Sequence, residues 1–150
     1  LEIYNVILEK KLLADLKMNA YYDFIHLNHV FEHFNSPNKE LSHIGRLLKK
    51  DGILYIEIPF QFNFVERLKY SFFKQKKDFT LSSIHHPFMY TPYTLNKILN
   101  NNGFDVIKCS VYNFKRYDRK LIIGITKNIL WFLLSLINVG TYIEVYAKKK

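Results

Sequence analysis

The sequence predicts an α/β fold with a mostly parallel sheet, and the stretch from Tyr22 to Phe60 carries most of that prediction. This stretch reads as a strand, a polar turn, a helix and a second strand, the order that gives a right-handed crossover between parallel strands. A second helix and a further strand are expected between Thr91 and Val111. The chain has 150 residues, of which 49% are hydrophobic, and this suffices for the core of one domain.

The first strand is expected at Tyr22–Leu27, a short run of aromatic and β-branched residues. The run stops at Asn28-His29. Because ligands bind at the carboxyl ends of parallel strands, this polar turn is the first candidate site. Ser36 and Pro37 then predict a helix start, with Ser36 as the N-cap and Pro37 at the first helical position.

The helix that follows is predicted by apolar residues at helical spacing, which give it one buried face: Leu41, Ile44, Leu47 and Leu48. The pair Lys49-Lys50 suits the negative end of the helix dipole, and Asp51-Gly52 is expected to end the helix. The second strand is expected at Ile53–Ile58, closed by Pro59.

The segments on either side of this unit are less regular. Leu1–Leu8 reads as a strand, and Glu9–Lys17 is expected to contain a short helix. Residues 61–83 are aromatic and basic with poor periodicity, so they are interpreted either as a variable insertion or as a plain surface excursion.

The second helix is expected to begin at Thr91-Pro92, with Thr91 as its N-cap, and to end at Gly103. Its predicted buried face consists of Tyr93, Leu95, Ile98 and Leu99. A strand is expected at Phe104–Val111, where Cys109 would be a small buried hydrophobic residue. The last strand is expected at Thr141–Ala147.

The net charge and the apolar runs indicate whether nucleic acid or a membrane is expected as a partner. The net charge is +9, but the lysines are dispersed, so a solvated basic surface is favoured over a face for nucleic acid or anionic membrane. The apolar run 129–139 is shorter than the ~20 residues that span a bilayer, and a buried or partly exposed helix is favoured over peripheral membrane contact. A single cysteine fits a reducing, cytoplasmic compartment.

The chain resembles a known family at these residues. Val30-Phe31-Glu32-His33 is similar to the V-L-E-H elbow after the fourth strand of class I S-adenosylmethionine-dependent methyltransferases. Leu47–Gly52 is similar to that family's L-L-K-P-G-G turn, with Lys50-Asp51 in place of Pro-Gly. His85–Pro92 resembles its H-x-x-x-F-T/S-P stretch, and Gly103–Cys109 resembles its sixth strand.

The resemblance implies a Rossmann-like three-layer sandwich, with a C-terminal antiparallel strand between strands five and six. Residues 1–150 would form the C-terminal part of a single methyltransferase domain, beginning at strand three, with the variable insertion at about 61–83. The fold would then be incomplete at the N-terminus.

The resemblance also implies S-adenosylmethionine as the cofactor. The backbone of Asn28, His29 and Val30 would face its methionine part, and Ile7 and Leu8 would flank its adenine. The glycine-rich turn that the family uses to approach the cofactor is absent, because no two glycines of this sequence form a Gly-x-Gly.

Candidate catalytic residues are His85, His86 and His29, since histidine is the side chain best suited to proton transfer near neutral pH. His85 and His86 are equally well read as loop histidines that help the turn. Phe60 and Tyr90 are expected either to wall the acceptor pocket or to belong to the core.

A metal site is a weaker hypothesis. His29, Glu32 and His33 are all able to bind a metal, and some relatives are thought to hold one at the matching positions, but this spacing alone does not specify a metal site. The favoured alternative is that Glu32 and His33 order the elbow through hydrogen bonds.

The resulting functional prediction is a methyltransferase acting on a small molecule or on a saccharide or lipid intermediate, inactive as these 150 residues alone. Two alternatives stay open. One is a basic α/β binding module without catalysis, and the other is a methyltransferase-like partner subunit.

Overall fold

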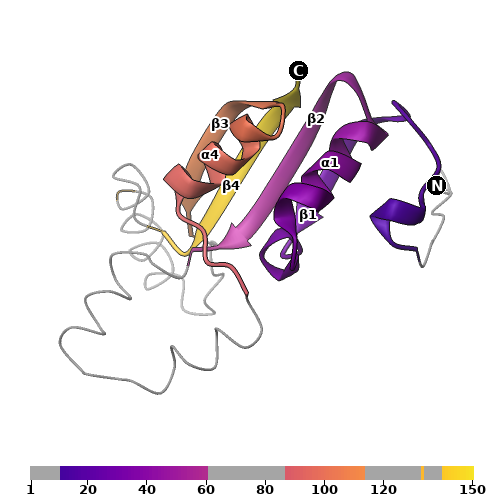
Figure 1. Cartoon of the computed structure of the whole chain (residues 1–150). Coiled ribbons are helices and arrows are strands. Elements are labelled where there is room, and N and C mark those ends of the chain that lie inside the picture. The colour runs from indigo at the N-terminus through magenta and orange to yellow at the C-terminus, as the bar shows by residue number, and fades with distance from the viewer. Residues whose placement is uncertain (1–10, 61–86, 114–132, 134–139) are drawn as a thin grey trace, which may run out of the picture.

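The computed structural model describes residues 11–60, 87–113, 133 and 140–150. These residues form a four-stranded sheet with two α-helices and two short 3-10 helices (Figure 1). In chain order the elements are η1 (Leu13–Asp15), β1 (Tyr22–Asn28), η2 (Phe31–His33), α1 (Pro37–Leu47), β2 (Leu48–Pro59), α4 (Pro92–Asn101), β3 (Phe104–Tyr112) and β4 (Tyr142–Lys149).

The strand order in the sheet is β1-β2-β4-β3. Strands β1 and β2 are parallel, and β4 runs antiparallel to both of its neighbours. The predicted α/β class is therefore confirmed, as are the crossover between parallel strands and the antiparallel strand inserted near the C-terminus. The predicted strand at Leu1–Leu8 and the segment 61–83 lie outside the described residues.

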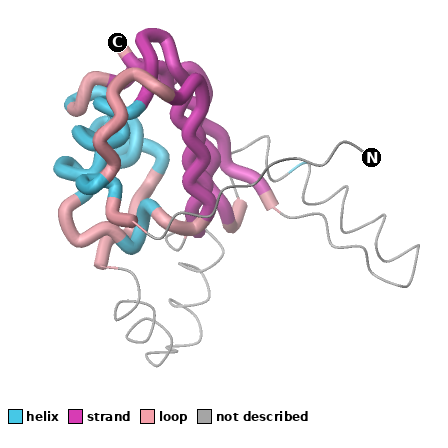
Figure 2. Tube along the Cα trace, turned by 90° about the vertical axis from the view of Figure 1, so that its right-hand side faces the viewer, coloured by secondary structure: helices cyan, strands magenta, loops and turns pink. Residues whose placement is uncertain are grey.

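The core lies between one face of the sheet and the two α-helices, which both cover that face (Figures 1 and 2). Alternate strand residues point toward the helices and are buried, as the two-residue period of a strand requires. In the two central strands these are Leu54, Ile56, Ile58, Ile143, Val145 and Ala147. They pack against Leu41, Ile44, Leu95 and Leu99 of the helices.

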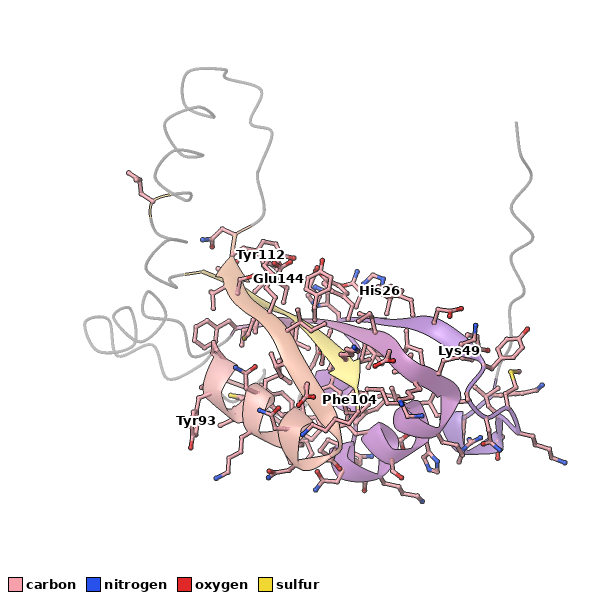
Figure 3. All side chains as sticks on the ribbon, turned by 90° about the horizontal axis from the view of Figure 1, so that it is seen from above. His26, Lys49, Tyr93, Phe104, Tyr112 and Glu144 are labelled. Carbon is pink, nitrogen blue, oxygen red and sulfur yellow. The ribbon has the colours of Figure 1, made fainter. Side chains whose placement is uncertain are left out.

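The opposite strand residues form what we call the second face, on the side of the sheet away from α1 and α4. It carries aromatic and polar side chains in lateral rows that cross the sheet. One row is His26, Tyr55, Tyr146 and Lys108, and another is Asn28, Glu57, Glu144 and Ser110. Figure 3 shows His26, Tyr112 and Glu144 on this face, whereas Phe104 lies among the helices and the sheet.

The boundary between α1 and β2 differs from the prediction. Helix α1 ends at Leu47, and Leu48 is already the first residue of β2. The residues at the start of β1 pair with the chain at this boundary and draw it into the sheet. The Tyr21 N–H donates to the Leu47 carbonyl at 2.9 Å, and Tyr22 pairs with Leu48. Lys49 therefore does not lie at a helix end, and its ammonium instead pairs with Asp23 at 2.8 Å.

Asp51-Gly52 forms an irregularity within β2 and not the end of a helix. Asp51 has a φ of +65°, and the pairing with β1 shifts between Tyr22 and Phe24. A Cβ atom added at Gly52 would lie 2.9 Å from the carbonyl oxygen of Lys49. A side chain at position 52 would therefore collide with the backbone, which explains the glycine in this turn.

Three other predictions need correction. Tyr93 does not belong to the buried face of α4, since 71% of its surface is exposed and it points away from the sheet (Figure 3). Within Glu9–Lys17, the described residues form only the 3-10 turn η1. Cys109 is half-buried at the edge of the core instead of fully enclosed. Among the described helices, none is long and apolar enough to span a membrane.

The two predicted N-caps behave differently. Thr91 and Thr94 form a reciprocal capping box at the start of α4, whereas the Ser36 side chain makes no capping hydrogen bond at α1. Ser36 has a ψ of 71°, outside the extended conformation in which Thr91 caps its helix. Pro37 nevertheless occupies the first helical position, as predicted.

We therefore expect Thr91→Ala to destabilise the protein by about 1 kcal/mol, since it leaves the Thr94 N–H without its side-chain acceptor. Ser36→Ala, which removes a hydroxyl that caps nothing, is the matched control and should change stability by less than about 0.5 kcal/mol. Urea unfolding followed by circular dichroism measures both. Equal losses for the two variants would contradict the difference between the caps.

Candidate functional site

The candidate site lies where the parallel strands β1 and β2 end at their carboxyl termini. The chain leaves β1 at Asn28, turns at His29 and enters the short helix η2. His29 has a φ of +52°, in the left-handed region, where histidine is among the more tolerant non-glycine residues. Its N–H donates to the Glu57 carbonyl at 2.9 Å, which anchors the turn to the end of β2.

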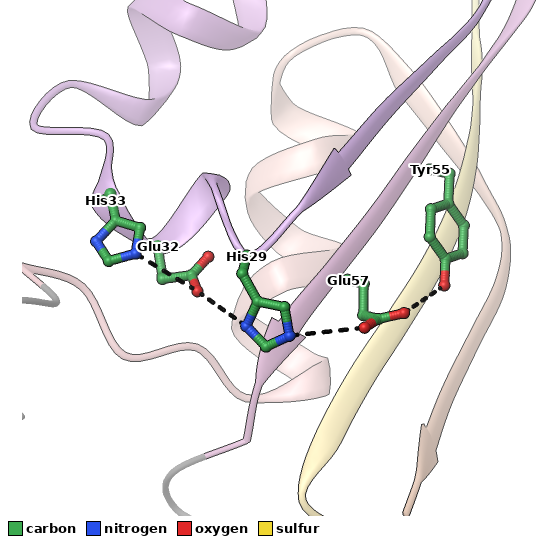
Figure 4. Close-up of polar contacts among 5 residues, drawn as sticks. All are labelled: His29, Glu32, His33, Tyr55 and Glu57. Carbon is green, nitrogen blue, oxygen red and sulfur yellow. Dashed lines mark hydrogen bonds and ion pairs between the residues drawn. The ribbon is translucent and has the colours of Figure 1, made fainter. Parts of the chain in front are cut away.

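This turn places the His29 ring between two buried carboxylates (Figure 4). Its Nδ1 lies 3.7 Å from Glu32 Oε1, and its Nε2 lies 3.6 Å from Glu57 Oε1. His33 Nε2 lies 3.9 Å from the same oxygen of Glu32. These separations suit ion pairs but exceed hydrogen-bond length.

Glu57 is held by phenol groups from two other strand positions. The Tyr55 hydroxyl donates to Glu57 Oε2 at 2.9 Å, and the Tyr112 hydroxyl also hydrogen-bonds to Glu57. Burial raises the pKa of both tyrosines, and the hydrogen bond to Glu57 raises it further. Both phenols therefore keep their protons and act as fixed donors, which orients the Glu57 carboxylate.

Aromatic rings surround this polar group. Tyr142 lies edge-on to the His29 ring, with the two ring centres 5.5 Å apart. On the η2 side, Phe31 is fully buried and packs against Tyr90, at 5.2 Å between ring centres. Phe60 packs against the core at the end of β2. The site is thus a polar group set in aromatic surroundings, the usual composition of a small-molecule site.

Glu32 is the unusual member of the group. It is 3% exposed, and neither of its carboxylate oxygens accepts a hydrogen bond among the described residues. The Tyr90 hydroxyl is likewise buried without a partner there. Burial raises the pKa of Tyr90 to about 12, and the negative charge of Glu32 contributes to the shift, so the two groups are electrostatically coupled.

The structure brings most of the predicted site residues to this one edge. Asn28, His29, Val30, Glu32, His33, Phe60 and Tyr90 all lie at or next to the ends of β1 and β2. The other predicted residues, Ile7, Leu8, His85 and His86, lie outside the described part of the chain. For those four the predicted roles stay predictions.

The predicted metal-binding set does not converge on one point. Glu32 contacts His29 and His33 only through ion-pair distances, and no group of three or more His, Cys, Asp or Glu side chains in the described part of the chain is arranged to hold a metal ion. The expected ordering of the elbow by hydrogen bonds of Glu32 is not seen either, because its oxygens accept none there.

Four residues of this group were not predicted from the sequence: Tyr55, Glu57, Tyr112 and Tyr142. A signal for Glu57 was present, because Tyr55 and Glu57 alternate with Leu54, Ile56 and Ile58 and so had to face away from the core. Tyr112 and Tyr142 carried no such signal. They reach the site because Tyr142 pairs with Pro59 at the end of β2 and with Tyr112 at the end of β3.

Comparison with known proteins gives a consistent picture. A family model described as a methyltransferase domain matches residues 7–109. No curated protein sequence matches the chain.

Solved structures share the fold at low sequence identity. An SAM-dependent methyltransferase from Archaeoglobus fulgidus is 19% identical, with a TM-score of 0.55, over 87% of this chain and 61% of that one. An SAM-dependent methyltransferase, possible histamine N-methyltransferase, from Thermotoga maritima is 18% identical, with a TM-score of 0.65, over 97% and 65%. Phosphoethanolamine N-methyltransferase 2 from Haemonchus contortus, in complex with S-adenosyl-L-methionine, is 13% identical, with a TM-score of 0.52, over 89% and 34%. The chain thus spans less than two thirds of each of these proteins.

Proposed function

The chain belongs to the methyltransferase-domain family, and from that premise we propose that it methylates a small-molecule acceptor with S-adenosylmethionine as the donor. The observation that carries the proposal is the His29–Glu57 pair at the carboxyl ends of β1 and β2. That position is where an α/β sheet binds its ligands, and the pair has the composition of a general base with a fixed orienting carboxylate.

The described residues fit the charge of this cofactor. The chain carries a net charge of +9, yet two buried carboxylates, Glu32 and Glu57, meet at this edge. Such a site suits a positively charged ligand. Asn28, His29 and Val30 would face the methionine part. The sequence carries no Gly-x-Gly turn, so these residues supply one side of the cofactor site only.

When bound, S-adenosylmethionine supplies a methyl group on a positively charged sulfur, so the protein has mainly to align the acceptor and remove a proton. We assign removal of the acceptor's proton to His29. The imidazole carries its own ring proton on Nε2, which faces Glu57, and its Nδ1 accepts the proton from the acceptor. Tyr55 and Tyr112 hold Glu57 in place, and Glu57 in turn holds the imidazole.

The acceptor is proposed to be a small molecule bounded by Phe60 and Tyr90. Two of the similar structures are named after small amines, one as a possible histamine N-methyltransferase and one as a phosphoethanolamine N-methyltransferase, which favours a small acceptor over a polymer. A saccharide or lipid intermediate is the alternative acceptor. His85 and His86 are retained as alternative bases, since they precede the Thr91 cap of α4.

Calorimetric titration with S-adenosylhomocysteine tests the proposal. The full-length gene product should bind it with a Kd in the micromolar range and should transfer a labelled methyl group to the small-molecule fraction of a cell extract. Label found only in protein or nucleic acid would contradict the proposed acceptor class. The 150 residues alone should bind no cofactor, and micromolar binding by them would contradict the proposed need for a glycine-rich turn.

A further inference from the structure

Two buried side chains at the edge of the site, Glu32 and Tyr90, carry polar atoms that no described residue hydrogen-bonds. Glu32 contributes two carboxylate oxygens and Tyr90 one hydroxyl oxygen, and all three atoms are buried without a hydrogen-bond partner among the described residues. A buried carboxylate without donors is unfavourable by several kcal/mol relative to water. A bound ligand or ion is one way in which a protein satisfies such a group.

The neighbouring histidines do not complete Glu32. His29 and His33 approach only Oε1, at 3.7 and 3.9 Å, and neither distance is a hydrogen bond. Their side chains are 39% and 46% exposed, so both rings are partly open to solvent beside Glu32. Figure 4 shows the Glu32 carboxylate lying between the two rings.

The side chains around Glu32 indicate the chemistry of the ligand group that would bind there. Three oxygen acceptors require a group with several N–H donors, and a carboxylate beside aromatic rings favours a cation. Phe31 and Tyr90, with ring centres 5.2 Å apart, supply those rings. A primary ammonium has three N–H donors and one positive charge, whereas a quaternary ammonium has no N–H to donate and an alcohol has no charge.

We propose that Glu32 and Tyr90 form the recognition site for a primary ammonium group of a ligand. This inference rests on the proposed function, because the ammonium has two sources in a methyltransferase: the methionine part of the cofactor and an amine acceptor. In both cases the cation sits next to His29 Nδ1, the atom assigned to proton removal.

Glu32→Gln is the decisive variant, since it keeps the shape of the side chain and removes the charge. Glu40→Gln, on α1 away from the site, is the matched control. In the 150-residue chain at pH 8, we expect Glu32→Gln to raise Tm by about 2 to 4 °C, because an uncompensated buried charge is removed. The control should leave Tm within about 2 °C. A fall in Tm for Glu32→Gln would show that Glu32 stabilises the free elbow, and would overturn the inference.

Calorimetry on the full-length gene product then separates the two sources. S-Adenosylhomocysteine carries the ammonium, and methylthioadenosine lacks the amino-acid part. Phenethylamine and the neutral phenethyl alcohol, titrated into protein saturated with S-adenosylhomocysteine, form the acceptor pair. Glu32→Gln removes a charged hydrogen-bond acceptor. It should therefore lower the affinity for the ammonium-bearing compound of one pair by about 10- to 100-fold and leave the affinity for the other compound of that pair unchanged.

If only the affinity for S-adenosylhomocysteine falls, Glu32 binds the ammonium group of the cofactor. If only the affinity for phenethylamine falls, Glu32 binds the ammonium group of the acceptor. Equal effects on both members of both pairs would overturn the inference. Wild-type protein that binds neither nucleoside would instead contradict the proposed function. The Tm comparison would still test whether Glu32 carries an uncompensated buried charge. If Glu32→Gln does not fold, Glu32→Asp, which retains the charge but withdraws it by one methylene, takes its place and should weaken the same member.

Discussion

Replacing Phe104 with alanine is expected to destabilise the protein by about 3 to 5 kcal/mol, a large share of the roughly 5 to 15 kcal/mol that holds a domain folded. Phe104 is fully buried at the start of β3, directly after the Gly103 turn that follows α4. A Cβ atom built on Gly45 would lie 3.8 Å from its ring, so the ring also reaches α1. Its loss opens a cavity where both helices meet the sheet.

Phe24→Ala is the matched control for this prediction. Phe24 is 52% exposed on the second face of β1, so the same change in side-chain size removes little buried surface. Urea unfolding followed by circular dichroism should show a much lower midpoint for Phe104→Ala and a midpoint close to wild type for Phe24→Ala. Similar midpoints for the two variants would mean that the core does not depend on the Phe104 ring.

Replacing His29 with asparagine is expected to lower kcat by about 10²- to 10⁴-fold, the usual contribution of a positioned general base. Asparagine is chosen because it tolerates the left-handed backbone of this position, where φ is +52°. The variant should therefore keep the turn, including the N–H donated to the Glu57 carbonyl, and lose only the imidazole. Its Tm and its affinity for S-adenosylhomocysteine should stay close to wild type.

His26→Asn serves as the control for the loss of an imidazole, because His26 lies in β1, the strand that precedes the His29 turn. His26 is exposed on the second face and contacts Tyr55 through its ring only, so kcat should change less than about threefold. The measurement is transfer of labelled methyl by the full-length gene product to the acceptor found in the extract. Full activity of His29→Asn would move the role of base to His85 or His86, whose variants would be tested next.

Local signals in the sequence were sufficient for most of the fold. The aromatic and β-branched run before Asn28, the Thr91-Pro92 start of α4 and the Gly103 end are each typical of one structure, because they act through backbone hydrogen bonds and φ preferences within a few residues. The resemblance to class I methyltransferases supplied the position of β4 in the sheet, which no local signal contains.

The wrong predictions about the helices have two causes. Leu48 and Lys49 continue a helical pattern, but pairing with Tyr21 and Tyr22 from a distant segment draws them into β2. For Leu48 and Lys49 a tertiary contact therefore outweighed a local preference. Tyr93 was assigned to the wrong face of α4: it lies two residues before Leu95, about 200° around the helix, and is exposed.

The sequence alone therefore determined that a strand ends in the polar turn Asn28-His29, and that Glu32 and His33 follow it. Only the tertiary structure decided that His29 lies between Glu32 and Glu57, and that Tyr55 and Tyr112 hold Glu57. The physical reason is the register of the sheet. Pairing of β2 with β4, and of β4 with β3, sets side chains far apart in the chain beside one another, and no spacing within the sequence records that register.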